Sequence, residues 1–587
     1  MFALGAASVA IGAVLRAFYA TLLWTGADRS ARRAKRLMIH AASGVIPLTL
    51  RVLAVVPLVT GFGAAAAAAP MWPGDAELEA QGTHIGNVTI RVLPIFDPEK
   101  PGEKRVLFQL ADKWHIDTRE SSIRAQLLFQ PGDPYSRRVL DETERNLRNL
   151  RFILEPQIRV VAYHDGLVDL EVVAHDVWTL NPGISFHRAG GKNTLGFQLE
   201  ELNLLGYGKH LTAGYHEDVD RSSYVLKWED PNLFGSRWIN RIDLVDSSDG
   251  QDKELELERP FYSLDSRWSG GIALDQGELI QSVYRLGQDV AEYRQSVEEV
   301  DLRYGWSKGL REGWARRWIV GLRHEAAKFS ESPDSAIPVT PPADRDLNYP
   351  YMRFEGVQDD FETTLNLDQI ARTEDQHFGM QYSVEIGWAA TAYGSDRDAA
   401  ILHAWTSRGF RLGDSRSLFV AGGLTGRIED GSARDAFVSG ALRYYWHTTP
   451  RSTFFVSLSG DAGRELDADH ELYLGGDNGL RGYPLRYQTG SGRSLLTIEQ
   501  RYYSKYSLWK LAQIGGAVFF DMGRTWGESA ILPTASLGVL KDVGIGLRLG
   551  STRSGLANVL HLDVAFPLDG DNSISNMQFI VETKRSF

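Results

Sequence analysis

The segment DVGIGLRLG, residues 542–550, alternates two kinds of side chain with a period of two residues. On an extended chain, one face from Val543 to Leu549 is wholly aliphatic, and the other face holds only glycines and Arg548. This pattern predicts a β-strand. A soluble sandwich would bury the aliphatic face, whereas a membrane barrel would turn it toward lipid, so the segment alone does not separate the two.

The same alternation recurs in TFFVSLS, residues 453–459, where Phe454, Val456 and Leu458 share one face. The chain is also rich in glycine (58), tyrosine (22) and tryptophan (15), a composition that suits an outer-membrane barrel with aromatic residues at both interfaces. A soluble all-β sandwich or propeller shares much of this composition. Beyond the N-terminal region, no stretch reaches the roughly 20 apolar residues of a spanning helix.

The region from 181 to 587 contains 407 residues. At about 25 residues for each strand and its connection, it would hold roughly 16 strands. We therefore predict an all-β transmembrane barrel of about 16 antiparallel strands, preceded by one small α/β domain. Cysteine is absent, which excludes disulfides and thiolate metal sites. The net charge of −12 argues against nucleic acid as a partner.

Residues 1–70 are predicted to be a targeting segment. A basic cluster, RSARRAKR (29–36), precedes an apolar stretch (52–63) and a run of alanines (64–69), which is the order of a secretory signal peptide. Translation from Met38 would leave a signal of ordinary length. The alternative is an uncleaved anchor helix, although Pro57 and several glycines interrupt it.

Residues 84–180 have a mixed pattern that predicts a strand, two helices and a closing hairpin with its turn at Asp165-Gly166. This order resembles one POTRA (polypeptide-transport-associated) domain, and GDPYSRRVLDETERNLRNLRFI (132–153) is close to the usual middle of that family. The resemblance implies a periplasmic domain that binds an extended client by adding a strand to its sheet. An unrelated small α/β domain remains the alternative.

An arginine stands inside the glycine-rich stretch LYLGGDNGLRGYP, residues 472–484. Five strand candidates follow this stretch, which places it on the extracellular side of a barrel whose last strand ends at the periplasm. The motif Gly479, Leu480, Arg481, Gly482 and Tyr483 resembles the sixth-loop motif of the BamA/TamA-type outer-membrane assembly superfamily. The resemblance implies that the loop tucks into the lumen and that its arginine meets acidic side chains on the next two strands.

Two acidic residues match that expectation. Glu499 lies opposite Leu496 and Ile498 on its strand, and Asp521 lies opposite Val518 and Phe520 on the next, so both would face inward if those apolar residues face lipid. The alternative is that Arg481 is an exposed turn residue. At the end of the chain, Phe579, Val581 and the terminal Phe587 share one face and resemble the signal that barrels present to their assembly machinery.

No HExxH, GxSxG or Walker motif and no histidine cluster at ligand spacing is present, so we predict no enzyme, no cofactor and no metal. The resemblance implies a protein that inserts or translocates others at the outer membrane, with an unfolded or extended client polypeptide and membrane lipid as partners. A periplasmic or inner-membrane partner is left open. The alternatives are a passive or structural pore and a dedicated two-partner-type secretion translocator. The resembled translocators typically carry two POTRA units and the assembly factors more, whereas one unit is recognised here.

Overall fold

The computed structural model describes residues 72–96, 115–509, 511–529, 531–532, 537–555, 558–570 and 574–584. The expected targeting segment at 1–70 and the terminal Phe587 lie outside these residues. Among the described residues, no helix is both long enough and apolar enough to cross a membrane.

A small α/β module precedes the barrel. It contains α3 (Asp75–Ala80), β1 (His84–Leu93), α5 (Glu120–Arg124), α6 (Arg137–Asn149), β2 (Ile153–His164) and β3 (Leu167–Asp176). The sheet order is β1-β3-β2, with β3 parallel to β1 and antiparallel to β2. Asp165 and Gly166 both have positive φ and form the tight β2–β3 turn.

The core of the module lies between α6 and the sheet. Leu140 and Leu147 fall on one face of α6, two helical turns apart, and pack with Val168, Leu170 and Val172 of β3. All five side chains are at most 1% exposed. The central strand β3 is therefore covered by the helix, while β1 and β2 form the two edges of the sheet.

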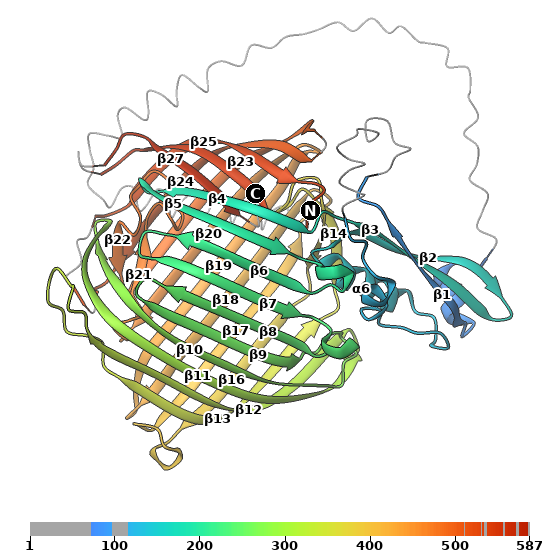
Figure 1. Cartoon of the computed structure of the whole chain (residues 1–587), viewed down its shortest axis with the longest axis horizontal. Helices are drawn as coiled ribbons and strands as arrows, with labels where there is room; N and C mark the ends of the chain where they lie inside the picture. Colours follow the sequence, from blue (N-terminus) through green and yellow to red (C-terminus); the bar gives the residue numbers. More distant parts are fainter. Residues whose placement is uncertain are drawn as a thin grey trace, which may run out of the picture. The chain divides into compact units, whose positions relative to one another are not determined.

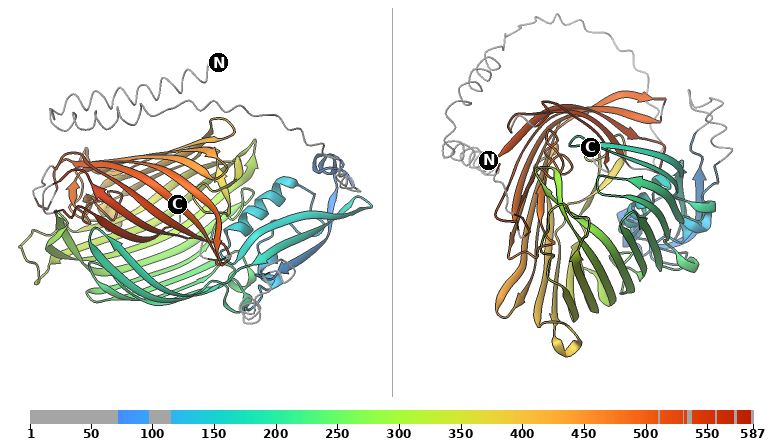
Figure 2. Two further views of the ribbon diagram at one scale, coloured as in Figure 1. Left: turned by 90° about the horizontal axis from the view of Figure 1, so that it is seen from above. Right: turned by 60° about the vertical axis from the view of Figure 1, so that its left-hand side comes forward.

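Twenty antiparallel strands then close into a barrel (Figures 1 and 2). They are β4 (Leu180–Ala189), β5 (Lys192–Glu201), β6 (His210–Glu217), β7 (Ser222–Asp230), β8 (Ile239–Ser247), β9 (Gly250–Arg259), β10 (Trp268–Arg285), β11 (Gln288–Arg311), β12 (Trp314–Glu331), β13 (Arg345–Gln358), β16 (Gln381–Ala389), β17 (Ala399–Arg411), β18 (Arg416–Glu429), β19 (Ser432–Thr449), β20 (Ser452–Arg464), β23 (Gly492–Leu508), β24 (Ala512–Trp526), β25 (Leu540–Ser551), β26 (Val559–Pro567) and β27 (Gln578–Lys584).

The prediction of about 16 strands was wrong. It assumed one even spacing along the chain, but the first six strands, β4 to β9, all fit between Leu180 and Arg259. These strands are 8 to 10 residues long, and the β4–β5 and β8–β9 connections are tight turns, so each uses about half of the assumed length. Most of the later strands are longer, up to 24 residues in β11, and the average spacing from β10 onward is close to the assumed value.

The two faces of the barrel wall differ in the way that separates a membrane barrel from a soluble sandwich. On β25, Val543, Ile545 and Leu547 are 36%, 59% and 42% exposed on the outside, while Arg548 is fully buried on the inside. Val518 on β24 and Tyr502 on β23 are likewise exposed. An apolar outer surface with charged residues enclosed by the wall is the reverse of a water-soluble core.

The first and last strands of the barrel, β4 and β27, are joined by little described strand pairing. The blue-green β4 and the red β27 lie side by side in Figure 1, yet among the described residues they share one register pair, Val581 with Arg188. The preceding pair of strands, β26 and β27, shares seven register pairs. The seam between β4 and β27 is therefore the least paired junction of the barrel among the described residues.

Two connections carry small sheets of their own. Residues 359–380 join β13 to β16 and contain β14 (Phe361–Leu365) and β15 (Thr373–His377), which form a hairpin at the end of the barrel next to the module. Residues 465–491 join β20 to β23 at the opposite end and contain β21 (Leu472–Leu474) and β22 (Gln488–Gly490). We call them the inner hairpin and the outer loop.

The module is bonded to the turns of the barrel at its own end. The carboxylate of Glu142 on α6 accepts a 2.7 Å hydrogen bond from the backbone N–H of Leu264, in the β9–β10 connection. The Ser122 hydroxyl donates to the carbonyl of Gly206 in the β5–β6 connection. Both Glu142 and Leu264 are buried. The contact surface of α6 is thus occupied by the barrel, and the sheet edges lie away from this contact.

Candidate functional site

The predicted site residues lie on the outer loop, which needs glycine where it approaches the wall. Gly479 has φ +125°, and a Cβ built on it would lie 2.1 Å from the side chain of Leu495. A Cβ on Gly482 would lie 2.7 Å from the Cβ of Asp542 and 3.0 Å from the backbone nitrogen of Pro567. Side chains at these positions would collide with β23, β25 and the end of β26, so the two glycines allow the loop to dock against the wall.

Arg481 lies between these glycines and contacts both predicted carboxylates. Its Nε is 2.6 Å from Asp521 Oδ2 and its Nη2 is 2.9 Å from Asp521 Oδ1, which is a two-pronged pair. Its Nη1 donates to Glu499 Oε1 at 2.9 Å. Glu499 comes from β23 and Asp521 from β24, so one guanidinium from the loop bridges two neighbouring strands.

The Arg481 contact is buried. The side chain of Arg481 is 8% exposed, and those of Glu499 and Asp521 are 5% and 0% exposed. Its guanidinium carbon lies 3.4 Å from the centre of the Phe519 ring. Burial disfavours the charged guanidinium, but the carboxylates of Asp521 and Glu499 outweigh it and hold the pKa of Arg481 well above its ordinary value. Arg481 therefore remains charged at physiological pH.

Leu480 and Tyr483 complete the docked motif. Both are fully buried, and they pack with Leu474 and Leu540. The Tyr483 hydroxyl lies 2.8 Å from the carbonyl oxygen of Lys541 and 3.2 Å from that of Asp569. Burial raises the pKa of Tyr483 to about 12, so its hydroxyl stays protonated. The loop is thus held by an apolar anchor as well as by the ion pair.

Sequence reasoning missed further charged residues around Arg481. Asp542 on β25 accepts the backbone N–H of Gly482 at 3.0 Å, and Asp563 on β26 lies 3.5 Å from Arg481 Nη1. Asp563 in turn pairs with Arg548, and the second oxygen of Glu499 accepts a 2.9 Å bond from Arg501 Nε. The alternation of β25 and β26 predicts that Asp542, Arg548 and Asp563 point inward, but it does not predict that they lie beside Arg481.

Comparisons with known proteins give resemblances of limited extent. No protein-family model matches the chain. A Treponema pallidum (strain Nichols) protein named for outer-membrane protein assembly is 31% identical over 124 residues, which is 19% of this chain and 15% of that protein. The match therefore spans a small part of that relative's length.

Three solved structures resemble this one at low sequence identity. BamA from Haemophilus ducreyi lacking POTRA domains 1–3 is 14% identical, with a TM-score of 0.38, over 85% of both chains. CdiB from Acinetobacter baumannii and from Escherichia coli are 13% and 12% identical, with TM-scores of 0.43 and 0.45; 85% of this chain matches 74% and 76% of theirs. Because these TM-scores are low, we assign the fold from the hydrogen-bonded strand order of the barrel and from the docked outer loop.

The chain resembles the BamA/TamA-type outer-membrane assembly superfamily. It is a closed antiparallel β-barrel with an apolar outer surface, preceded by a POTRA-like α/β module. The inner hairpin lies at the end of the barrel next to the module, and the outer loop enters the lumen from the opposite end.

The expected terminal signal is only partly described. Phe579 on β27 is 49% exposed on the outer face and pairs with Val564 of β26. Val581 shares that face and forms the single register pair with Arg188 at the seam. Phe587 lies outside the described residues. The recognition role of these residues stays a prediction.

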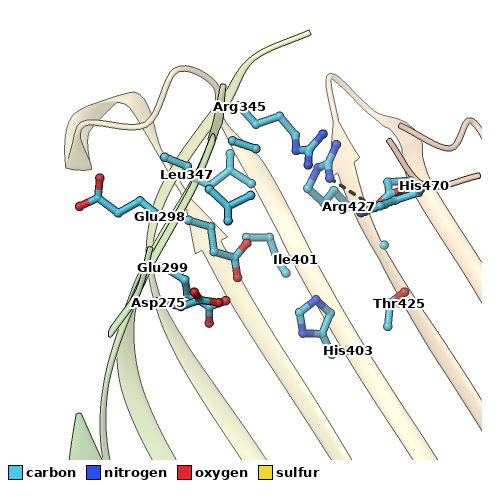
Figure 3. A pocket seen from close by; sticks show the side chains of 16 residues that line it. Asp275, Glu298, Glu299, Arg345, Leu347, Ile401, His403, Thr425, Arg427 and His470 are labelled. Atoms are coloured by element: carbon cyan, nitrogen blue, oxygen red, sulfur yellow. Dashed lines mark hydrogen bonds and ion pairs between the residues drawn. The ribbon is translucent and has the colours of Figure 1, made fainter. Parts of the chain in front are cut away.

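A second charged region lies in the lumen toward the end opposite the module (Figure 3). Its cavity has a volume of about 420 Å³, with the carboxylates of Asp275 and Glu299 on one side and Arg427 and His470 on the other. The basic groups already have acidic partners, since Arg427 Nη2 lies 2.8 Å from Asp467 and His470 Nδ1 lies 2.9 Å from Asp435. Paired charges of this kind line a polar lumen and form no nucleophile–base arrangement.

Two described groups have the ligand types and spacing of a metal site. They are His115 with Asp117 and Asp176, and Asp435 with Asp467 and His470. In the first group Asp176 already accepts hydrogen bonds from His115, from the backbone of Thr118 and from its hydroxyl. In the second, the neighbouring guanidinium of Arg427 balances the carboxylates. We assign no metal to either group.

The glycine requirement predicts a specific defect. In Gly482→Ala, the new methyl group would meet Asp542 and the backbone at Pro567, so the loop should dock less often. We expect faster cleavage of residues 465–491 by a protease added to intact cells. Gly440→Ala is the matched control, because nothing lies within 4 Å of a Cβ built there. Equal cleavage of the two variants would contradict this account.

Proposed function

We propose that this chain inserts or translocates other proteins at the outer membrane. Residues 1–70 would direct export, residues 84–180 would receive an unfolded client in the periplasm, and residues 181–587 would form the working barrel. The observation that carries the proposal is the seam, where β4 and β27 share one register pair among the residues that the structure describes. The barrel itself would act without a catalytic group, through strand pairing.

The seam supports this role because unpaired strand edges bind other strands. Backbone N–H and C=O groups along an unpaired edge are a template for an incoming β-strand. At β4–β27 only Val581 and Arg188 are in register among the described residues, whereas all ten residues of β4 pair with β5. A client strand could pair with β27 or β4 along the part of the seam that has no described register pair, because few described pairs must first be broken.

The module offers a sheet edge for the same chemistry. The edge of β1 is partly covered, because Ile85 donates its backbone N–H to Asp133 at 2.8 Å and Tyr135 donates to Thr83 at 2.8 Å. On β2, Val161 is 41% exposed, and the strand lies at the other edge of the sheet. Since α6 is docked on the barrel, strand addition at β2 is the favoured route for an extended client.

A disulfide across the seam tests the proposal. The chain has no cysteine, so Arg188→Cys with Val581→Cys introduces one defined pair. Directly opposed antiparallel residues have Cβ atoms about 4.5–5.5 Å apart, which is close enough for a disulfide after a small adjustment. We expect the oxidised pair to arrest function and a reductant to restore it. The readout is the level of other barrel proteins and of exported proteins after the wild-type chain is depleted.

The control pair is Val564→Cys with Phe579→Cys, which links β26 to β27, where seven register pairs already exist. This disulfide should leave function unchanged. Broad loss of barrel proteins with the locked seam supports insertion, and loss of one exported protein supports a dedicated translocator. If neither class of protein falls when the seam is locked, the proposal is wrong and a passive pore is favoured.

A further inference from the structure

The inner hairpin reaches across the periplasmic end of the lumen to the far wall. Its stem begins and ends on β13 and β16, while its tip, residues 366–372, contacts strands much farther round the barrel. The carbonyl of Asn366 accepts a 2.8 Å bond from the Tyr503 hydroxyl of β23. Arg372 donates to the carbonyl of Ser554, just after β25. The tip is therefore bonded to strands that are not neighbours of its stem.

The tip is also packed as a core. Leu367 and Ile370 are each 1% exposed. Leu367 packs with Tyr445 of β19 and Phe455 of β20, and Ile370 packs with Tyr503 and with residues of β24 and β26. A loop lying free in a wet lumen would not bury both aliphatic side chains, so this contact is a closed interface.

The tip and the outer loop face each other inside the barrel. A cavity of about 250 Å³ is lined by Asp368 from the tip, by Arg481 from the outer loop, and by Glu499 and Arg501 from the wall. Arg501 links them, because its Nη1 donates to the carbonyl of Leu367 at 3.1 Å and its Nε donates to Glu499. The lumen is thus occupied from both ends, and a continuous chain of bonds joins the two insertions.

Helix α6 of the module contacts the stem of the same hairpin, on the side that faces the module. Arg148 makes two 2.7 Å hydrogen bonds to the carboxylate of Asp375 on β15, with both side chains less than 15% exposed. The guanidinium of Arg145 lies 3.7 Å from the ring centre of Phe361 on β14.

We propose that residues 359–380 are a plug that closes the periplasmic mouth of the barrel, and that α6 latches it. A movement of the module breaks the Arg148–Asp375 pair and frees the stem, and the tip then leaves the far wall. This latch, the Arg148–Asp375 pair, allows a movement of the client-binding module to open the pore even though no client touches the tip. This closure does not depend on which client the barrel handles.

The first test removes the tip. Leu365 and Thr373 are register partners, so replacing residues 366–372 with Asn-Gly closes the same hairpin with a two-residue turn. Purified full-length protein in a planar lipid bilayer with KCl should then show a several-fold higher conductance. A heat-shifted band on a gel verifies that the variant is folded. A folded variant with unchanged conductance would overturn the proposal.

The second test uses the latch and leaves the tip intact. Asp375→Asn, or Arg148→Glu, should increase the open time of the channel, and Arg148→Glu with Asp375→Arg should return it toward the resting value. Recovery by the charge swap would not follow from general damage to the module. Arg434→Glu is the matched control, because Arg434, near the start of β19, forms an exposed 2.8 Å pair with Glu465 at the end of the barrel away from the module. An effect of this control equal to that of Arg148→Glu would contradict the latch.

The third test locks the plug. A Cβ built on Gly550 of β25 lies 2.8 Å from the Cβ of Ile370, so Ile370→Cys with Gly550→Cys places two thiols within disulfide reach once the tip shifts slightly outward. In the Asp375→Asn background, oxidation should abolish the increase in open time, and a reductant should bring it back. Channels that open equally when oxidised and reduced would rule out movement of the tip as the gate.

Discussion

Arg481→Ala is expected to lower the free energy of unfolding of the barrel by about 3–5 kcal/mol, the cost of breaking a buried ion pair from one side. Removal of the guanidinium leaves Asp521 fully buried with one described side-chain donor, the Thr497 hydroxyl at 2.9 Å. Glu499 keeps Arg501 as a partner, so most of the loss comes from Asp521. The measurement is urea unfolding of the folded protein in lipid vesicles, supported by the heat-shifted band on gels.

Arg434→Ala provides the comparison for this measurement. Its ion pair with Glu465 is also short, 2.8 Å, but the two side chains are 50% and 55% exposed. Exposed pairs are worth about 0–1 kcal/mol, because water screens them and solvates whichever partner remains. Equal costs for the two alanine variants would show that the lumen around Arg481 is wet, and the outer loop would then be held by its apolar anchor alone.

The kind of strand was predictable from local sequence, but the number of strands was not. The alternation around Arg548 is a property of nine consecutive residues, and it correctly separates inward from outward side chains. Strand number depends on the length of each strand and turn, and the described barrel strands vary from the 7 residues of β27 to the 24 of β11. No single spacing describes both, so an average taken over the region underestimated the number of strands.

In the site, too, local sequence predicted some residues, whereas contacts that depend on distant strands were not predicted. Alternation and the loop motif placed Arg481, Glu499 and Asp521, and the structure brings all three within hydrogen-bond distance. The contribution of Asp563 was missed because it depends on β26 lying two strands beyond β24 in the closed wall. The inner hairpin was also missed, since a polar connection such as 359–380 gives no sign in its own sequence that its tip is buried against distant strands.

A second large effect is expected at Arg548, which lies on β25 behind the outer loop. Arg548→Met keeps much of the length of the side chain but removes its charge, and it leaves Asp563 buried at 3% exposure. The remaining described cation near Asp563 is Arg481, whose Nη1 is 3.5 Å away and already engaged by Glu499. We expect a loss of about 3–5 kcal/mol in the free energy of unfolding, measured by urea titration in vesicles.

The double variant Arg548→Met with Asp563→Asn distinguishes the cost of an unpaired charge from the loss of packing. Replacing both members of a buried pair removes the uncompensated carboxylate, so the double variant should be more stable than Arg548→Met alone. The methionine introduced at position 548 has the same packing in both variants, so packing cannot produce this difference. The single variant Asp563→Asn completes the comparison. If the stability losses of Arg548→Met and Asp563→Asn simply add in the double variant, the two residues act independently, and their ion pair does not stabilise the wall behind the loop.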